Sequence, residues 1–495
     1  MIAVDDKSIW KHLSTLAALL GSLLSLFLWV EDRSVFLDEA NLIRNIYERS
    51  YLELLSPLDY DQSAPFLFTW GGKIFSNILG SSTMVLRLFP LLLVVASIWL
   101  LWRLANTAFS WPVALYVNAF YSLHMLVLRY AGECKQYGAD LFAVVLLLYL
   151  YYTYKPNKWT RAIIWAVVGS LMLWLSMPSV FVLAGIGLAW PVELITNSRA
   201  VKINDTQTKK EPPQLDTSIL KLGVVALVWL GAVAVNYHFI LAPGLASGHM
   251  QDYHAQYFLD ITSIESVQKS LLTFIRLIAK KSAVGIAAAV ILLLAGIWSL
   301  RKRSECIVLL LPILLALLFS ALGMYSLLER LILFALPLLL MMAGYGLLAI
   351  LNIRMRPILK NVILLVLLIG ILIAFSNRQG TKLIAIHPME DLKSALVKMP
   401  HDINKPIYTS RHAYPTYHHY TEIDKIISEN NIILGSQLSN ISTEIKTLIR
   451  AKEFWIILSH IDNMNAEKQG IMDSFEILKI YEAKGSMIFK VRTRT

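Results

Sequence analysis

Long apolar runs, separated by short polar segments, dominate the first three-quarters of the chain. Most runs approach the ~20 residues that a helix needs to cross a bilayer. The pattern therefore predicts a polytopic α-helical membrane protein with about eleven membrane spans. The spans are expected at 13–30, 84–103, 111–128, 138–154, 162–177, 179–195, 219–240, 283–299, 306–323, 331–350 and 359–376.

Amphipathic stretches interrupt this pattern between the spans. Apolar Ala40, Ile43 and Ile46 alternate with polar groups over 38–46, which predicts a helix lying on the bilayer surface. A second such helix is expected over 66–79, after a polar, proline-containing turn. Both belong to the first loop, and a further amphipathic stretch covers 264–278.

The last quarter of the chain has the composition of a soluble domain. We therefore expect two domains, a membrane domain over 1–380 and a small α/β domain over 381–495. Strands are expected at 406–410, 453–459, 475–481 and 486–492, and helices at 389–399 and 441–451.

Basic residues gather in the loops after every second span, for example at 155–161 and 301–303. Because cytoplasmic loops carry an excess of lysine and arginine, we expect the N-terminus inside and the C-terminal domain outside the cytoplasmic membrane. Only 16% of the residues are charged, and this orientation signal accounts for the net charge of +11. We therefore expect no nucleic-acid partner.

Carboxylates and cations from three distant segments fall on the predicted outer face. Asp38 and Glu39 follow the first span, Glu133 and Lys135 join the third and fourth, and Arg330 precedes the tenth. Charged groups at the edge of a bilayer are costly unless polar partners meet them. The convergence therefore predicts a polar site at the membrane surface.

Such a site suits glycosyl transfer from a lipid phosphate. Asp38 or Glu39 would take or orient the proton of the acceptor. Arg330 or Lys135 would stabilise the departing phosphate. Structural explanations exist for each group: carboxylates favour a helix N-terminus, Glu133 can pair with a neighbouring cation, and an arginine can anchor the end of a span.

Three histidines in the C-terminal domain raise the question of a metal. His412, His418 and His419 match no zinc-ligand spacing, and no carboxylate or cysteine accompanies them. We expect them to be surface residues.

At these positions the sequence resembles bacterial members of the GT-C glycosyltransferase superfamily, of the protein-mannosyltransferase and lipid A aminoarabinose-transferase type, similar to glycosyltransferase family 39. The resemblance covers roughly residues 10 to 376. The matching motifs are Leu37-Asp38-Glu39-Ala40 with Arg44-Asn45-Ile46, Pro57-Leu58-Asp59-Tyr60 with Gln62-Ser63-Ala64-Pro65, Glu133-Cys134-Lys135-Gln136-Tyr137, and Glu329-Arg330-Leu331.

The resemblance implies the GT-C fold and an inverting enzyme that moves a hexose or pentose from a polyprenyl-phosphate donor. The acceptor would be a lipid, glycan or protein outside the cytoplasm. Asp38, Glu39 and Glu133 would be catalytic, and a divalent metal at Asp38 and Glu133 stays open, since some relatives use one. The implied substrate-binding residues are Tyr60, Gln62, Lys135, Gln136, Tyr137, Tyr325 and Arg330, of which Lys135, Tyr137 and Arg330 would hold the donor phosphate.

Two other classes of function remain as alternatives. A transporter or flippase of lipid-linked sugars predicts ionisable residues near the middle of the spans and broken helices in paired positions. A non-catalytic membrane scaffold with an outer binding domain leaves the charges gathered at one face unexplained.

Overall fold

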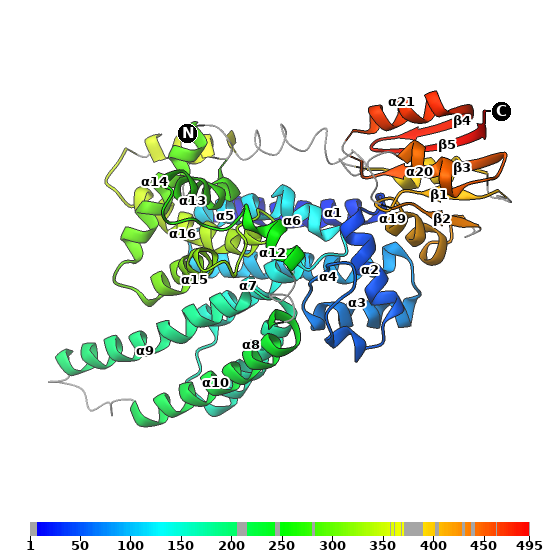
Figure 1. Ribbon diagram of the computed structural model, residues 1–495. Coiled ribbons are helices and arrows are strands. Elements are labelled where there is room, and N and C mark those ends of the chain that lie inside the picture. The colour runs from blue at the N-terminus through cyan, green and yellow to red at the C-terminus, as the bar shows by residue number, and fades with distance from the viewer. Residues whose placement is uncertain are drawn as a thin grey trace.

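The protein is described by a computed structural model, in which helices lie side by side in a bundle (Figure 1). The residues described are 7–204, 215–242, 248–279, 283–356, 358–360, 362–367, 369–370, 390–400, 405–427, 431–436, 441–461 and 463–494. The helices of the bundle and its loops are α1 (Lys7–Val30), α2 (Leu37–Glu48), η1 (Glu53–Leu55), α3 (Phe66–Leu79), α4 (Thr83–Ala108), α5 (Trp111–Ser122), α6 (Met125–Ala131), α7 (Tyr137–Thr153), α8 (Trp159–Leu175), α9 (Ser179–Asn204), α10 (Leu215–Asn236), η2 (Tyr237–Leu241), α12 (Gly248–Ala255), α13 (Ile264–Ile278), α14 (Ala283–Leu300), α15 (Ser304–Ala321), η3 (Ile332–Phe334) and α16 (Ala335–Leu351).

The apolar helices make this a multi-pass membrane protein. Among the described residues, seven helices are long and apolar enough to cross a bilayer, and α5 with α6 forms an eighth candidate bent by 51°. The helices α7 and α8 fall where spans were predicted, but each has only 17 residues. The last predicted span, 359–376, lies partly outside the described residues. The count of eleven spans is therefore not confirmed.

The bundle has a buried centre and an apolar rim. Of the residues in the most apolar 18-residue stretch of each helix, 89% are buried in the span that contains α16 but only 17% in the span that contains α10. Leu227 and Leu230 of α10 are 70% and 64% exposed. Apolar side chains on the outside of a helix bundle are what hydrocarbon surroundings favour, so this rim is the surface that faces lipid.

The amphipathic helices form where the pattern predicts them. The helices α3 and α13 have the predicted bounds, and α2 covers the stretch predicted at 38–46. Ile43 and Ile46 of α2 are fully buried, while Glu48 on the same helix is exposed. A turn that includes the left-handed residues Tyr60 and Asp61 separates α2 from α3.

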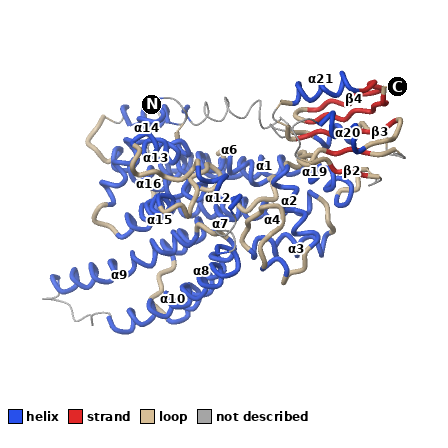
Figure 2. The backbone as a smooth tube through the Cα atoms, in the orientation of Figure 1, coloured by secondary structure: helices blue, strands red, loops and turns tan. Residues whose placement is uncertain are grey.

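A mixed five-stranded sheet stands at one end of the bundle, the end where α2 and α3 lie (Figure 2). Its order is β2-β1-β3-β5-β4; β1 pairs in parallel with β2 and β3, and β5 pairs antiparallel with β3 and β4. The elements of this part are α18 (Leu392–Val397), β1 (Ile407–Thr409), α19 (Tyr414–His418), η4 (His419–Ile423), β2 (Ile432–Leu434), α20 (Ile441–Leu448), β3 (Glu453–Ser459), α21 (Met464–Ser474), β4 (Phe475–Ala483) and β5 (Ser486–Thr493).

The four predicted strands are therefore confirmed, and so are the two predicted helices, as α18 and α20. The three-residue strand β2 and the helices α19 and α21 were not predicted. The proposed domain boundary between residues 380 and 381 lies outside the described residues.

A close approach of α14 and α16 yields a first prediction. A Cβ atom on Gly346 of α16 would collide with the carbonyl oxygen of Leu292 in α14. Small residues let membrane helices approach closely. We expect Gly346→Val to lower the free energy of unfolding in detergent by about 1–3 kcal/mol, as overpacking does elsewhere. Thermal denaturation of the purified protein measures this loss.

The matched control is Gly231→Val on the lipid-facing helix α10, where nothing lies within 4 Å of an added Cβ. It should leave the denaturation temperature nearly unchanged. Equal losses in the two variants would contradict the close packing of α14 against α16.

Candidate active site

Asp38 and Glu39 point to different surroundings because they are neighbours on a helix. Successive residues of an α-helix are about 100° apart around its axis, so adjacent side chains cannot share a face. Glu39 is turned into the protein and is 2% exposed, whereas the Asp38 side chain is 33% exposed. The pair of carboxylates therefore divides into a buried member and an accessible one.

Glu39 forms a buried, two-pronged ion pair with Arg87 of α4. Arg87 Nε donates to Glu39 Oε1 at 2.8 Å, and a terminal nitrogen donates to Oε2 at 2.7 Å. The Cys134 amide also donates to Glu39, at 2.7 Å. Burial opposes the ionisation of Glu39, but Arg87 and these hydrogen bonds outweigh it and lower its pKa. Glu39 thus links α2, α4 and the segment before α7.

Arg87 is a site residue that the sequence analysis missed. It is 1% exposed and also donates to the carbonyl oxygen of Arg33 at 2.8 Å. It lies near the start of a strongly apolar helix. The signal that could have identified Arg87 is its position inside an apolar span, because charged residues there nearly always have a buried partner.

Asp38 forms an ion pair with Arg330, 292 residues later in the chain. A terminal nitrogen of Arg330 donates to Asp38 Oδ2 at 3.0 Å. Burial opposes the ionisation of Asp38, but the charges of Lys135 and Arg330 and this hydrogen bond hold its pKa below the ordinary value. The Arg330 side chain is 30% exposed, so both members of the pair can be reached from outside.

Arg330 also has one donor that is unpaired among the described residues. Its Nε is buried and, among the described residues, has no hydrogen-bond partner. Gln136 Oε1 and Ser326 Oγ are likewise buried and unpaired within the described structure. Buried polar atoms are rarely left unpaired, and exceptions often mark the position of a ligand or water.

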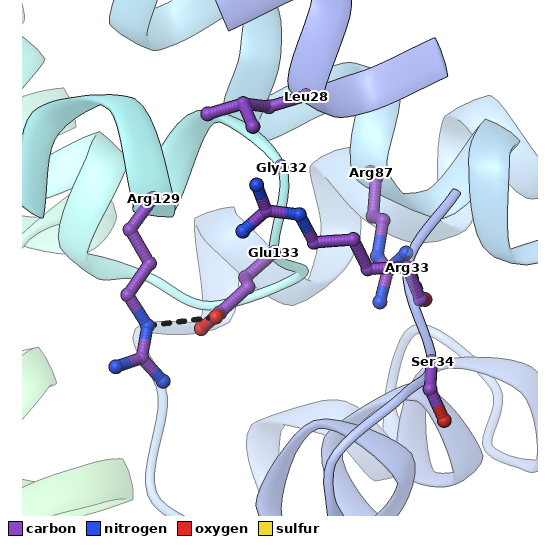
Figure 3. A pocket seen from close by; sticks show the side chains of 7 residues that line it. All are labelled: Leu28, Arg33, Ser34, Arg87, Arg129, Gly132 and Glu133. Atoms are coloured by element: carbon purple, nitrogen blue, oxygen red, sulfur yellow. Dashed lines mark hydrogen bonds and ion pairs between the residues drawn. The ribbon is translucent and has the colours of Figure 1, made fainter. Parts of the chain in front are cut away.

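Glu133 lies in a separate contact, with Arg129. It accepts a hydrogen bond from Arg129 Nε at 2.8 Å, and both residues line a small cavity of about 10 Å³ (Figure 3). Figure 3 shows Arg33 and Arg87 on the opposite wall. Burial raises the pKa of Glu133, with Arg129 opposing the increase. Asp38 and Arg330 do not line this cavity.

Lys135 and Gln136 connect the segment before α7 to the turn between α2 and α3. Lys135 Nζ donates to Gln62 Oε1 at 3.0 Å, and Gln136 Nε2 donates to the Ser63 carbonyl oxygen at 3.0 Å. Lys135 is 8% exposed. Burial lowers its pKa, and the nearby Asp38 partly restores it. Lys135 therefore lies beside the Asp38–Arg330 pair.

The three predicted tyrosines have different positions. Tyr137 interacts electrostatically with Arg330 and Asp38, and Tyr325 donates to the Leu331 carbonyl oxygen at 2.6 Å, next to Arg330. Tyr60 lies elsewhere: its ring lies 4.8 Å from the guanidinium of Arg44. Arg44 is six residues beyond Asp38, about 9 Å along the helix.

The placed side chains do not form a metal site. Asp38 faces Arg330 and Glu133 faces Arg129. No group of three or more His, Cys, Asp or Glu side chains suited to a metal occurs among the described residues. Zinc sites take three or four such ligands, whereas Mg²⁺ is commonly held by one or two carboxylates together with water and substrate phosphate. A divalent metal held by Asp38 and Glu133 therefore stays a prediction, and we derive no step through a metal.

The C-terminal part reaches the first loop through residues that the sequence analysis did not assign to the site. Tyr420 accepts a hydrogen bond from the Val35 amide at 2.7 Å. His419 is 1% exposed and shares a 2.6 Å hydrogen bond with Thr83 Oγ1. The prediction that all three histidines are surface residues is therefore wrong for His419, because it is buried in this contact.

No protein-family model and no curated protein matches this sequence. Similarity to solved structures, in contrast, covers nearly the whole chain. The chain is similar to ArnT from Cupriavidus metallidurans in the apo state, with a TM-score of 0.50 and 11% identity over 95% of this chain and 97% of that chain. The likeness covers nearly the whole of both chains and, at 11% identity, concerns the fold alone; the predicted fold is thereby confirmed.

Two further structures have lower scores. ArnT from Cupriavidus metallidurans bound to undecaprenyl phosphate gives a TM-score of 0.49 and 12% identity over 95% of this chain and 97% of that chain. The Archaeoglobus fulgidus oligosaccharyltransferase in complex with Zn and sulfate gives 0.43 and 12% over 96% of this chain and 73% of that chain.

The buried ion pair yields a second prediction. Glu39→Gln removes the two-pronged partner of buried Arg87 and leaves it, among the charged contacts of the described residues, only the longer one with Asp32 at 3.4 Å. Breaking a buried pair by removing one partner typically costs about 3–5 kcal/mol. We expect a loss of that size in the free energy of unfolding, measured by denaturation in detergent. Adding Arg87→Met should recover part of it, because the unpaired charge is then gone.

Glu305→Gln serves as the comparison, since Glu305 pairs with an Arg303 that is 51% exposed. Exposed pairs contribute about 0–1 kcal/mol. A Glu39→Gln variant as stable as Glu305→Gln would show that the Glu39–Arg87 pair does not hold the site together.

Proposed function

We propose that this protein is an inverting membrane glycosyltransferase that moves a sugar from a polyprenyl-phosphate donor to an acceptor. The sugar is a hexose or pentose, and the acceptor is a lipid, glycan or protein. The observation that carries the proposal is the Asp38–Arg330 ion pair, which brings a carboxylate and a guanidinium from distant segments to an accessible point beside buried Lys135. The GT-C fold supports the same class of enzyme.

Arg330 and Lys135 are suited to bind the phosphate of the donor. A guanidinium has five N–H donors, and Nε of Arg330 is buried and unpaired within the described structure. Lys135 adds a second positive charge from the segment before α7. Because both cations lie near the bilayer edge in this proposal, the polyprenyl tail stays in the lipid while the phosphate enters the site.

Asp38 is suited to receive the acceptor. In the proposed step, the acceptor hydroxyl attacks the anomeric carbon and the bond from that carbon to the phosphate oxygen breaks. Asp38 orients the hydroxyl and takes its proton, and the polyprenyl phosphate leaves paired with Arg330 and Lys135. A single displacement of this kind inverts the anomeric centre. The lowered pKa of the Asp38 carboxyl keeps this group ionised at neutral pH.

The proposal assigns Glu39 and Glu133 to supporting positions. Glu39 holds Arg87, and Glu133 holds Arg129, so in this proposal each carboxylate is engaged by an arginine and neither takes the proton. We keep the division into a membrane domain over 1–380 and an outer domain over 381–495. We also keep the site on the outer face of the cytoplasmic membrane, as the distribution of basic loops predicts.

The variant Asp38→Asn, in which an amide nitrogen replaces one carboxylate oxygen, tests this function. Asp38→Asn keeps the shape of the side chain but removes the proton acceptor. We expect transfer to fall by about 10²-fold or more, which is the usual contribution of a general base. Mass spectrometry of envelope glycolipids, glycans and proteins from cells lacking the chain, supplied with either form, measures the product.

Asp38→Asn should fold and accumulate like the wild type, because Asp38 is partly exposed. Near-normal product from this variant would remove Asp38 from the mechanism. If the wild type itself restores no envelope modification, the protein is not a glycosyltransferase of this kind.

Donor binding yields a further prediction. We expect Arg330→Gln to weaken the binding of undecaprenyl phosphate, used as a polyprenyl-phosphate probe, by about 10- to 100-fold, because a charged hydrogen bond contributes roughly 1.5–3 kcal/mol. Tryptophan fluorescence in detergent micelles reports the Kd. Arg276→Gln on the outer helix α13 makes the same change at an exposed position and should bind the probe normally. Equal affinities in the two variants would rule out Arg330 as the phosphate ligand.

A further inference from the structure

The helix that carries Asp38 has no N-terminal cap of its own. The first amides of an α-helix lack partners within the helix, and a polar side chain at the N-cap usually supplies one. In α2 the N-cap is Phe36, whose side chain accepts no hydrogen bond. The Leu37 amide instead donates to Glu390 Oε1 at 2.8 Å. The cap therefore comes from a residue 353 positions later in the chain.

Glu390 is held firmly in this position. It is fully buried, and its second oxygen accepts a hydrogen bond from Ser459 Oγ at 2.8 Å. Ser459 in turn lies 2.7 Å from Ser486 Oγ, at the start of β5. The Glu390 carboxylate is thus anchored to the end of β3 and the start of β5.

The chain before α2 is bound by the same part of the protein. Tyr420 accepts the Val35 amide, and Lys393 Nζ donates to the carbonyl oxygen of Asp32 at 3.0 Å. His460, directly after β3, packs its ring against Phe36 at 5.2 Å. Contacts from three C-terminal segments therefore determine how the chain enters α2.

We propose that Glu390 is a positioning residue of the active site, which sets the direction of Asp38 toward Arg330 by capping α2. The inference rests on the proposed function, in which Asp38 meets the acceptor. Asp38 follows directly after Leu37, so a shift of the capped amide moves the carboxylate with it. A misplacement of about 1 Å in a reacting group can reduce a rate by about 10²-fold. The C-terminal part is then a component of the catalytic machinery.

The charge of Glu390 gives this role a signature in the pH profile. Burial raises its pKa to about 7, against its two hydrogen bonds, and the charge of Asp38 adds to the increase. The titratable groups facing it are Asp38 of α2 and His460 after β3, 3.8 Å away. Its own segment contributes Asp391, and the β4–β5 turn contributes Lys484, whose carbonyl accepts the Asp391 amide.

The sign follows from the chemistry of the cap. Above about pH 7 the ionised Glu390 is a stronger acceptor for the Leu37 amide and makes Asp38 a stronger base. The transfer rate therefore gains a component that rises as the pH passes through about 7. The variant Glu390→Gln still offers an oxygen to the amide but cannot ionise, so it lacks this component.

The experiment uses the full chain in membrane vesicles from cells that otherwise lack it, with the lipid-linked sugar and acceptor already present in the vesicles. We expect Glu390→Ala to lower the transfer rate by about 10- to 100-fold. We expect Glu390→Gln to recover most of the rate at low pH and to lose the rise near pH 7. Amide hydrogen exchange of the peptide covering 34–40 should be faster in Glu390→Ala and restored in Glu390→Gln.

Glu444 is a matched control in the same part of the protein. It is also buried, and it accepts one backbone amide, from Ser436, and one hydroxyl, from Tyr408 at 2.8 Å. Glu444→Ala should lower thermal stability while leaving the pH profile and the exchange of 34–40 unchanged. A wild-type pH profile in Glu390→Gln, or a change equal to that in Glu444→Ala, would overturn the inference.

The exchange measurement separates this inference from the proposed function, because it needs no substrate. If the wild type transfers no sugar, the proposed function fails. If the wild type transfers sugar but exchange over 34–40 ignores residue 390, only the positioning role fails.

Discussion

The buried pair between Glu39 and Arg87 is the constraint on which the site depends. Two opposite charges in a protein interior are stable only when each finds its hydrogen-bond and charge partners. Glu39 is therefore held by Arg87 and the Cys134 amide, and Arg87 by Glu39 and the Arg33 carbonyl oxygen. These bonds lock α2, α4 and the segment before α7 into one unit. Because these bonds fix the rotation of α2 about its own axis, the residue before Glu39, Asp38, is turned toward Arg330.

The adjacent carboxylates show how one sequence motif serves two purposes. Helix geometry separates the side chains, so the buried member can stabilise the structure while the accessible member remains available for chemistry. The cations divide in the same way. Arg87 is paired within the protein, whereas Arg330 keeps a buried Nε donor that is unpaired among the described residues. In the proposed function, this donor is in place before the phosphate of the donor lipid binds.

Features with a regular period could be predicted from the sequence. The amphipathic helices α3 and α13 and four of the five strands depend on local spacing, and each lies where it was expected. Local spacing also predicted the apolar helices of the bundle, although the count of eleven spans is not confirmed. The meeting of Asp38, Lys135 and Arg330 followed from topology, because basic loops assign each segment to a membrane face. The bend between α5 and α6 was not predicted; it falls at residues 122–124, where the side chain of His124 caps α6.

Partners far apart in the sequence could not be predicted in the same way. Nothing near Phe36 indicates that Glu390 caps the following helix, and nothing near His419 indicates that Thr83 covers it. Such pairs depend on how the C-terminal sheet rests on the first loop. Burial of His419 and the pairing of Glu39 with Arg87 are both results of tertiary packing, which single-residue patterns do not record.

The distant cap of α2 also has a consequence for biosynthesis. The ribosome makes Leu37 early and Glu390 353 residues later, which at about 5–20 residues per second is a delay of roughly 20 to 70 s. During that interval α2 has been synthesised, but the Leu37 amide has no Glu390 carboxylate to accept its hydrogen bond. A truncated or unfinished chain therefore carries Asp38 on a helix whose first amide still lacks the Glu390 carboxylate as its acceptor.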